Sequence, residues 1–429
     1  MKAELALEMH SSITIKDEDA LYKKVILRIV PLFFIGFILS YLDRVNISFA
    51  KLQMAADFGL SNASFAVGAS IFFWGYMLFE IPSNLVLQKV GARAWISRIL
   101  VTWGIVSMLM IFSKSQPAFY SLRFLLGVCE AGFVPGVLYY TSTWLPSKRQ
   151  SGMYSLFLMA LPISVVLGAP LSGAILEGMN GVMGIKGWQW LFILEGMPSI
   201  ILGFVILLLL RNKPSDVEWL NDSEKKIIED NVAREAKHKS HRVGDAFTSG
   251  KVYALVLVMI LFNTGFYGLT FWMPTLFRNA GIDNSFHVGL YTAIPFGAAA
   301  FAMFFNAKQA EKSGRIRLHG MVPVLLASVG LFLATLFHDH FWFSLVMLTV
   351  ATSGILSLMP IYWTLPGRVL SGSAAAAGLA LINSCGSLSG ALGALIIGYS
   401  GIQVGMYILA AFLFLCGMLF YFVCPAKTV

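Results

Sequence analysis

Charged residues are scarce in this chain: Asp, Glu, Lys and Arg together make up only 12% of its 429 residues. Soluble globular proteins contain about 25% of these residues, so the composition excludes an ordinary soluble fold. The chain also contains no GxxxxGKS/T nucleotide loop, no HExxH zinc motif and no cluster of Cys and His. We therefore expect no enzyme, no cofactor and no metal site, and the energy for any uphill process must come from a gradient.

Only four cysteines occur, and their positions indicate packing. Cys129, Cys385, Cys416 and Cys424 are scattered through apolar stretches, without the spacing of a metal or redox pair. We interpret them as small buried hydrophobic residues. Residues 1–24 are polar and charged and lack a small-residue cleavage site, so we predict no signal peptide.

Long hydrophobic runs take the place of charge, because hydrophobic residues make up 57% of the chain. A run of about 18 apolar residues is long enough to cross the hydrocarbon core of a bilayer as a helix. We therefore predict an all-α polytopic membrane protein with twelve transmembrane helices. The expected spans cover residues 25–52, 64–88, 95–113, 119–145, 153–176, 189–211, 251–276, 288–307, 320–337, 341–366, 373–398 and 404–424.

Lys and Arg are distributed unevenly between the two sides that these spans define. With the N-terminus in the cytoplasm, few of the 31 Lys and Arg residues fall in outer loops, namely Lys51, Lys114, Lys186 and Arg278. Cytoplasmic loops are enriched in these residues, so we predict that both termini are cytoplasmic. The net charge of +9 then reflects topology, and we expect no nucleic-acid partner.

A polar segment, residues 212–250, divides the spans into six and six. Two pairs in it have capping-box spacing, Ser215 with Glu218 and Asn221 with Glu224, and predict one or two short helices. The predicted domains are a cytoplasmic segment, a first bundle, a linker, a second bundle and a tail, at residues 1–24, 25–211, 212–250, 251–424 and 425–429.

The two halves also echo each other in sequence. WLPSKRQSG follows the fourth span of the first half, and TLPGRVLSG follows the fourth span of the second. Such internal repeats are typical of transporters whose substrate site lies between two related bundles. We therefore predict two pseudo-symmetric six-helix bundles with a site between them.

Two pairs of charged residues interrupt the apolar spans. Asp43 and Arg44 are adjacent in the first span, and Arg123 and Glu130 lie about two helical turns apart on one face of the fourth. An ionisable group at membrane depth usually faces the protein interior or a water-filled path. We interpret Asp43 and Glu130 as candidate proton carriers, since such a carboxylate can change its charge state with its surroundings. The alternative is a permanent carboxylate–arginine pair with a structural role.

Arg44 and Arg123 are candidate ligands for an anion, because a guanidinium group stays charged and can bind a carboxylate through two hydrogen bonds. We assign Arg44 to the substrate, and one of the two arginines is expected to hold a carboxylate. Glu80 lies near the end of the second span and close to Arg93, which predicts a gate or a helix-end ion pair. Glu195, in the sixth span, is interpreted as structural.

The second six spans contain no ionisable residue away from their edges and offer neutral hydrogen-bonding groups. We expect these groups, with Tyr76 of the second span, to contact the uncharged part of a hydroxylated or aromatic substrate. Each one alone is also compatible with ordinary packing. The candidates are Asn263, Tyr267, Trp272, Trp363, Asn383 and Ser384.

Several motifs together resemble the major facilitator superfamily and, within it, the anion:cation symporter family. They are SYLDRVNISFA at 40–50, GYMLFEIPSNLVLQKVGAR at 75–93, SLRFLLGVCEAGFVPG at 121–136, GWQWLFILEGMPS at 187–199 and WTLPGRVLSGSAAAAGLALIN at 363–383. The resemblance covers essentially the whole chain. It implies a bacterial inner-membrane carrier, expected to be monomeric, for sugar acids, tartrate, phthalate or hydroxyphenylacetate, generally with protons.

The resemblance also assigns residues. It implies that Asp43 and Glu130 are the protonation sites, that Arg44, Tyr76 and Asn383 line the substrate site, and that Arg123 lies next to the acids. The superfamily usually has an Asp in the loop after the second span, where this chain has Gln88. Its counterpart in the second half is retained as Glu311, with Arg315 nearby, and these two are candidate gate residues.

The function that we predict is proton-coupled symport of a small organic anion by alternating access, with the anion, protons and the bilayer as partners. An antiporter or efflux carrier on the same fold is the alternative, and the GAPLSG pattern of the fifth span resembles an antiporter motif. A sensor without transport activity is disfavoured, because the only sizeable soluble segment is the short central linker.

Overall fold

The computed structural model describes residues 2–237, 250–365 and 372–424, and within them the regular structure is helical. Twelve membrane-spanning segments are found in these residues, as predicted. The first half contains α1 (Lys2–Phe58), α2 (Asn62–Val90), α3 (Ala92–Leu109), α4 (Gln116–Glu130), α5 (Phe133–Ser142), α6 (Ser147–Gly178) and α7 (Gly187–Leu209). The second half contains α10 (Gly250–Asn279), α11 (Ser285–Ser313), α12 (Ile316–Leu336), α13 (Phe341–Tyr362), α15 (Gly372–Ser400) and α16 (Ile402–Val423).

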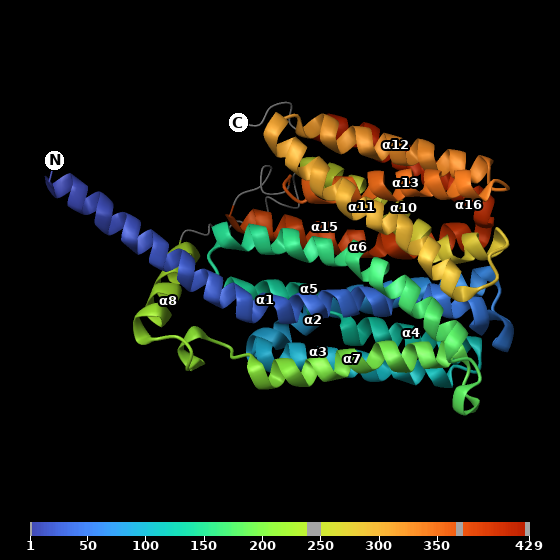
Figure 1. Cartoon of the computed structure of the whole chain (residues 1–429), viewed down its shortest axis with the longest axis horizontal. Helices are drawn as coiled ribbons and strands as arrows, with labels where there is room; N and C mark the ends of the chain where they lie inside the picture. Colours follow the sequence, from blue (N-terminus) through green and yellow to red (C-terminus); the bar gives the residue numbers. More distant parts are fainter. Residues whose placement is uncertain (1, 238–249, 366–371, 425–429) are drawn as a thin grey trace.

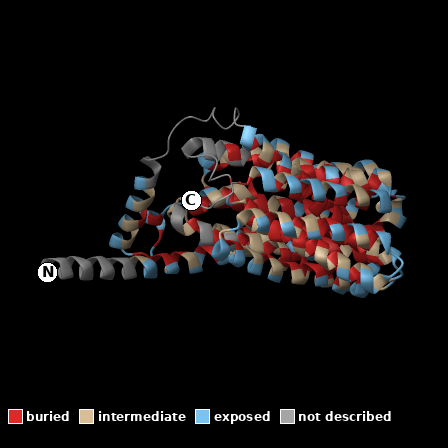
Figure 2. Ribbon diagram, turned by 90° about the horizontal axis from the view of Figure 1, so that it is seen from above, coloured by how far each residue is buried: buried red, intermediate tan, exposed pale blue. Residues whose placement is uncertain are grey.

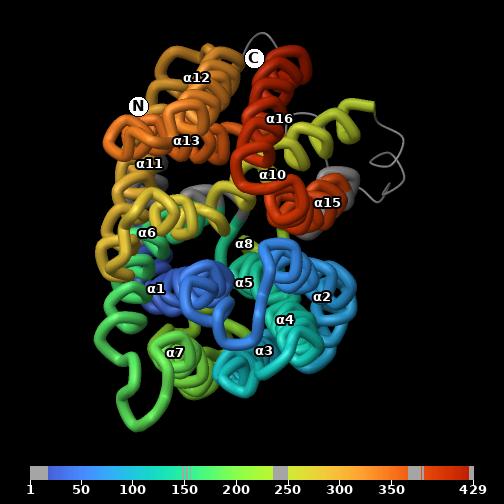
Figure 3. The backbone as a smooth tube through the Cα atoms, turned by 90° about the vertical axis from the view of Figure 1, so that its right-hand side faces the viewer, coloured from blue at the N-terminus to red at the C-terminus, as the bar shows by residue number. Residues whose placement is uncertain are grey.

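The two halves form two helical bundles that lie side by side (Figures 1 and 3). Three helix pairs make most of the interface between them: α1 packs on α10, α2 on α15, and α6 on α11. Helix α8 (Asp222–Lys237) lies beyond one end of the bundles, which we call the α8 end. The opposite end, where α1, α6 and α10 finish, is called the far end.

The outside of the bundles exposes many large apolar side chains, and several charged and polar groups are buried inside. Figure 2 shows that buried residues fill the interior of the bundles and that exposed residues lie on the outside. Phe301 and Leu208 expose about 70% of their surface, whereas Asp43, Arg123 and Glu130 expose none. This is the reverse of a soluble protein and is the arrangement that a lipid environment favours. The chain is therefore an integral membrane protein.

Helix α1 continues without a break from Lys2 to Phe58 and so crosses the predicted boundary between residues 24 and 25. In the linker, Asn221 and Glu224 form the predicted capping box, each accepting a hydrogen bond from the other's backbone N–H. The other predicted capping box is not formed: Ser215 lies in a short 3₁₀ turn, Pro214–Asp216. An ion pair between Lys24 and Glu224, at 3.2 Å, ties α8 to α1.

The fourth span is not the continuous helix that the sequence predicted. Helix α4 ends at Glu130, and α5 starts at Phe133 after a break at Ala131 and Gly132. Gly132 has φ +89°, a left-handed conformation that favours glycine, and a Cβ placed there would lie 2.4 Å from the Ser83 hydroxyl of α2. The break therefore follows from backbone geometry and close packing, and it places Glu130 at a helix end.

Three predicted segments fall wholly or partly outside the described residues. They are the second copy of the internal echo, of which residues 366–371 are not described, the linker after residue 237, and the tail at 425–429.

Candidate functional site

Arg44 and Glu130 form an ion pair at the centre of the first bundle's inner face. One guanidinium nitrogen of Arg44, Nη2, donates to Glu130 Oε1, and the Ser40 hydroxyl donates to the same oxygen at 2.8 Å. Ser40 precedes Arg44 by four residues, so both side chains lie on one face of α1. The second carboxylate oxygen of Glu130, Oε2, is buried without a hydrogen-bond partner among the described residues.

The same guanidinium group reaches across the bundle interface. Arg44 Nη1 donates to the Tyr267 hydroxyl of α10 at 3.2 Å. The guanidinium carbon also lies 5.2 Å from the ring centre of Phe72 and 5.4 Å from that of Tyr76, both on α2. Within about 6 Å an aromatic face attracts a cation. Arg44 thus contacts the Glu130 carboxylate, two aromatic rings of α2 and a hydroxyl group of the second bundle.

Arg123 contacts the same Phe72 ring and has different hydrogen-bond partners. Its guanidinium carbon is 5.0 Å from the Phe72 ring centre, and its Nε donates to the Gly68 carbonyl at 3.3 Å. The terminal nitrogens Nη1 and Nη2 are buried without a partner among the described residues. The sequence favoured Arg44 as the substrate ligand. In the structure Arg44 pairs with Glu130, and Arg123 keeps two donors for another acceptor.

Asp43 occupies a separate polar cluster, and it does not pair with any arginine among the described residues. Its Oδ1 accepts from Ser107 at 2.9 Å and from Asn46 at 3.3 Å. Its Oδ2 accepts from Trp103 Nε1 at 2.9 Å and from Ser199 at 3.1 Å. A carboxylate has about four lone-pair sites, so this set of donors from α1, α3 and α7 suits the ionised form.

Glu80 does not make the ion pair that its position in sequence predicted. Its Oε1 accepts a 2.7 Å hydrogen bond from Asn383 Nδ2 of α15, across the bundle interface. Arg93 instead donates through Nε to the Leu207 carbonyl at 2.6 Å, which fastens the start of α3 to the end of α7. Arg98 lies over the Trp95 ring, at 3.9 Å from its centre.

The remaining predicted residues are spread over the second bundle. Tyr267 and Asn383 reach the first bundle, as described above. Trp363 follows the C-terminal end of α13 at the α8 end, and its described ring contact is with Tyr362. Glu311 and Arg315 are exposed around the turn between α11 and α12. Trp363, Glu311 and Arg315 are therefore not gathered with the central charges in this structure.

Sequence reasoning missed several residues that complete the site. Ser40 could have been found from its helical spacing to Arg44. Trp103, Ser107 and Ser199 carry no such signal, because they come from distant helices and resemble ordinary membrane-helix residues. Glu195, interpreted as structural, is buried and accepts from the Ser172 hydroxyl at 2.7 Å, which joins α7 to α6.

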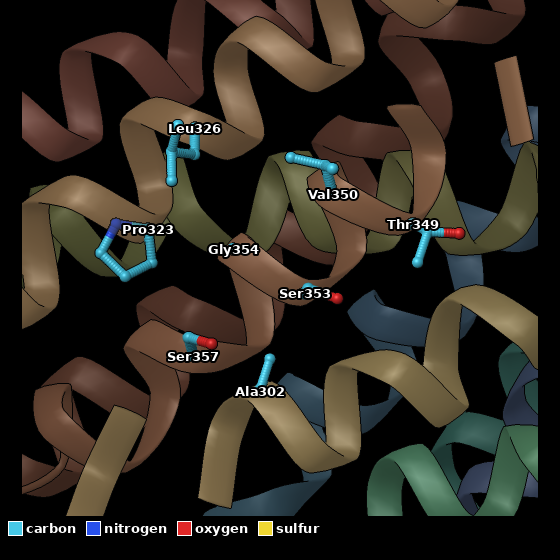
Figure 4. A pocket seen from close by; sticks show the side chains of 8 residues that line it. All are labelled: Ala302, Pro323, Leu326, Thr349, Val350, Ser353, Gly354 and Ser357. Atoms are coloured by element: carbon cyan, nitrogen blue, oxygen red, sulfur yellow. The ribbon is translucent and has the colours of Figure 1, made fainter. Parts of the chain in front are cut away.

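A pocket of about 260 Å³ lies away from the charged cluster, within the second bundle (Figure 4). It is lined by Pro323, Leu326, Val350 and other small or apolar residues of α11, α12 and α13. Its lining offers hydroxyl groups but no charged side chain, so it does not suit an organic anion. The groups able to bind such a ligand are at the bundle interface.

The central arrangement can perform two linked tasks. The guanidinium group of Arg44, which contacts both bundles, can bind an anion. The carboxylate of Glu130, which is paired with that guanidinium group, can exchange a proton. Because one group contacts both partners, neutralising Glu130 would leave Arg44 free to bind an anion.

Comparisons with known proteins find relatives that are named as transporters. The chain is 44% identical to a putative tartrate transporter of Agrobacterium vitis, covering 89% of this chain and 88% of the relative. It is 40% identical to the putative metabolite transport protein NicT of Pseudomonas putida, over 90% and 89%. It is 34% identical to a quinolone resistance transporter of Acinetobacter baumannii, over 96% of both chains.

The fold is likewise that of known transporters. A bacterial homologue of the human lysosomal transporter Spinster, solved in an inward-facing and occupied conformation, superposes with a TM-score of 0.75 at 17% identity, covering 92% of this chain and 96% of that one. The sequence profile of the Major Facilitator Superfamily matches residues 33–394. The chain therefore belongs to the Major Facilitator Superfamily of membrane transporters.

Proposed function

We propose that this protein couples the uptake of a small organic anion to the movement of protons by alternating access between its two bundles. The observation that carries the proposal is the shared guanidinium group of Arg44, which contacts Glu130 in its own bundle and Tyr267 in the other. The names of the relatives, which include two transporters of small metabolites, support the same substrate class.

Competition for Arg44 provides the coupling. While Glu130 is ionised, it occupies Arg44 and offers a negative charge that repels an incoming carboxylate. A proton on Glu130 removes that charge and frees Arg44 to bind the substrate, so anion and proton enter together. The unpartnered Oε2 of Glu130 is the atom on which a proton can be placed without breaking an existing hydrogen bond.

Arg123 is proposed as a second anion ligand, because its two terminal nitrogens are buried without partners among the described residues. The two guanidinium carbons lie 5.2 Å and 5.0 Å from the same Phe72 ring centre, and we propose that a dicarboxylate or hydroxy acid binds both arginines. Asp43 is proposed as a second protonation site, which differs from Glu130 because both of its oxygens already accept hydrogen bonds. Protonation there requires one of its serine donors to rotate and become an acceptor.

The second bundle is proposed to recognise the uncharged part of the substrate. Tyr267 and Asn383 supply neutral donors and acceptors at the interface, and Tyr76 supplies an aromatic face from the first bundle. Trp363 stays a weaker candidate, because its described contact is with Tyr362 at the end of α13. Glu80, Arg93, Glu311 and Arg315 are proposed to act in gating or in holding helix ends.

We infer the orientation of the protein in the membrane from the distribution of Lys and Arg. Because Lys and Arg are concentrated at the α8 end, we propose that this end is cytoplasmic and that the far end faces outward. We further propose that the protein acts as a monomeric importer in a bacterial inner membrane.

Efflux on the same fold is the second candidate, favoured by the likeness to a quinolone resistance transporter. One experiment separates the two functions. Proteoliposomes are given an imposed pH gradient and labelled tartrate, galactonate, phthalate and hydroxyphenylacetate, with ciprofloxacin as the efflux probe. We expect accumulation of at least one acid, driven by the proton gradient. Transport of ciprofloxacin alone would favour efflux and would contradict the proposal.

A further inference from the structure

A second buried cation lies on the same face of α1, about two turns beyond Arg44 towards the far end. Lys51 follows Arg44 by seven residues, about 10 Å along the helix axis. Its side chain is largely buried, with 6% of its surface exposed. No ion pair of the described residues includes it, so its charge is not balanced by a carboxylate.

The partners of Lys51 are neutral and come from both bundles. Its ammonium group donates to Asn62 Oδ1 of α2 at 2.9 Å and to the Thr275 hydroxyl of α10 at 3.4 Å. It also lies 3.7 Å from the ring centre of Trp272 and 4.8 Å from that of Phe65. Two neutral oxygens and two aromatic faces hold a cation without neutralising it.

Helix α1 therefore contacts α10 through two cations. Arg44 donates to Tyr267, and Lys51 donates to Thr275, eight residues further along α10. The two bundles also contact each other elsewhere at the far end, so the far end is closed around Lys51. Glu177 of α6 accepts from the Ser285 backbone N–H of α11 at 3.0 Å.

We propose that Lys51 is a further anion-binding residue, at which a carboxylate arriving from the far end binds before it passes to Arg44. The inference rests on the proposed alternating access. When the bundles part at the far end, Lys51 loses Thr275 and Trp272 of α10 and keeps Asn62 of its own bundle. The ammonium group of Lys51, without a carboxylate partner, then lines the opened path at about 10 Å from Arg44 along α1.

The chemistry of the closed state fits this role. A carboxylate partner would have balanced Lys51 permanently and would have to be displaced by every substrate. Aromatic rings and neutral oxygens hold the ammonium group when the far end is closed and release it without leaving a buried anion behind. The expected ligand is a small organic carboxylate, and its electrostatic attraction to Lys51 weakens as the ionic strength rises.

The test compares transport from each face of the membrane. Lys51→Met removes the charge at similar side-chain length, and Lys51→Arg retains it. Thr275→Val removes the hydrogen bond to α10 while leaving the ammonium group. Lys114→Met is the matched control, because Lys114 is exposed at the same end away from the bundle interface. Initial rates for the four labelled acids are measured in right-side-out and inverted vesicles at low and high salt.

We expect Lys51→Met to raise the KM from the far-end face roughly tenfold at low salt, with a smaller effect at high salt. The KM from the α8 face, the Lys114→Met control and Thr275→Val should stay close to wild type, and Lys51→Arg should restore most of the loss. An equal effect from both faces, or the same effect from Thr275→Val, would show a closing contact only and would overturn the proposal.

The outcome also distinguishes this proposal from the proposed function. If wild-type protein transports none of the acids, the proposed function fails and the role of Lys51 falls with it. If wild-type protein transports them and Lys51→Met behaves like Lys114→Met, only the role of Lys51 is overturned.

Discussion

Asn383 of α15 donates a 2.7 Å hydrogen bond to Glu80 of α2, which joins the two bundles. The second oxygen of Glu80 is buried without a partner among the described residues. The contact therefore holds a carboxylate at the interface through a single neutral donor. Such a contact can break and reform as the bundles move, and a substrate with hydroxyl groups can replace either partner.

Replacement of Asn383 should change which acids are preferred. Asn383→Ala removes the donor, and discrimination of about 1–3 kcal/mol per altered contact is the expected scale. We predict a changed ranking between sugar acids and aromatic acids, with an unchanged pH dependence of uptake. Uptake of the substrate panel across pH measures both. Ser387→Ala, one turn along α15, is the control, and a shifted pH profile with an unchanged ranking would contradict the assignment.

Arg44 should set the requirement for a carboxylate. Loss of a buried charged partner costs about 2–5 kcal/mol, so Arg44→Ala should weaken binding of the best-transported acid by far more than tenfold. Arg44→Lys should restore little, because the planar group that contacts both Glu130 and Tyr267 is lost. Equilibrium binding to purified protein measures this. Arg28→Ala is the matched control on the same helix, and it removes a guanidinium group 4.6 Å from the Trp219 ring. Similar losses for both variants would refute the role of Arg44.

The cluster around Asp43 should contribute to stability. Trp103→Phe removes the indole donor to Asp43 Oδ2, and a buried charged acceptor that loses one donor is destabilised by about 1–3 kcal/mol. Trp190→Phe is the control, because its indole donates to a backbone carbonyl of Val182 at an exposed position. Thermal unfolding of the purified protein should show a clear fall in melting temperature for Trp103→Phe only. Equal melting temperatures would mean that the indole bond is not important for the fold.

The break between α4 and α5 should depend on Gly132. Gly132→Ala imposes a positive φ on alanine and brings its Cβ against Ser83, and strain of this kind costs about 1–3 kcal/mol. Gly178→Ala is the control, because a Cβ at the end of α6 meets nothing within 4 Å. We predict a lower melting temperature for Gly132→Ala and little change for Gly178→Ala. A Gly132→Ala variant as stable as wild type would indicate that the break tolerates a side chain.

Much of this fold was predictable from the sequence, because membrane insertion leaves a direct signal in hydrophobic run length. The twelve spans followed from that signal, whereas the break at Gly132 did not, since Ala131 and Gly132 are common inside membrane helices. The linker shows the same limit. The Asn221–Glu224 capping box forms, but Ser215 at the same spacing from Glu218 lies in a 3₁₀ turn. In that turn the Asp216 carboxylate accepts from the Lys213 backbone N–H.

The charged residues of the candidate site could be predicted from the sequence, but which of them contact each other could not. Asp43, Arg44, Arg123 and Glu130 stand out because charge inside an apolar span is costly and therefore informative. Which arginine meets which carboxylate depends on the helix packing, and sequence spacing within α4 could not show that Arg44 of α1 is the partner of Glu130. The contact of Glu80 with Asn383 was missed for the same reason, because it joins two halves of the chain.

The most direct test of the account is proton movement during anion uptake, because coupling through Glu130 is its central claim. Proteoliposomes without an imposed gradient receive the best-transported acid, and a pH electrode follows the weakly buffered medium. Wild-type protein should make the medium more alkaline as the acid enters, whereas Glu130→Gln should exchange labelled for unlabelled acid without any pH change. Alkalinisation by Glu130→Gln at the wild-type ratio of protons to acid would contradict the account.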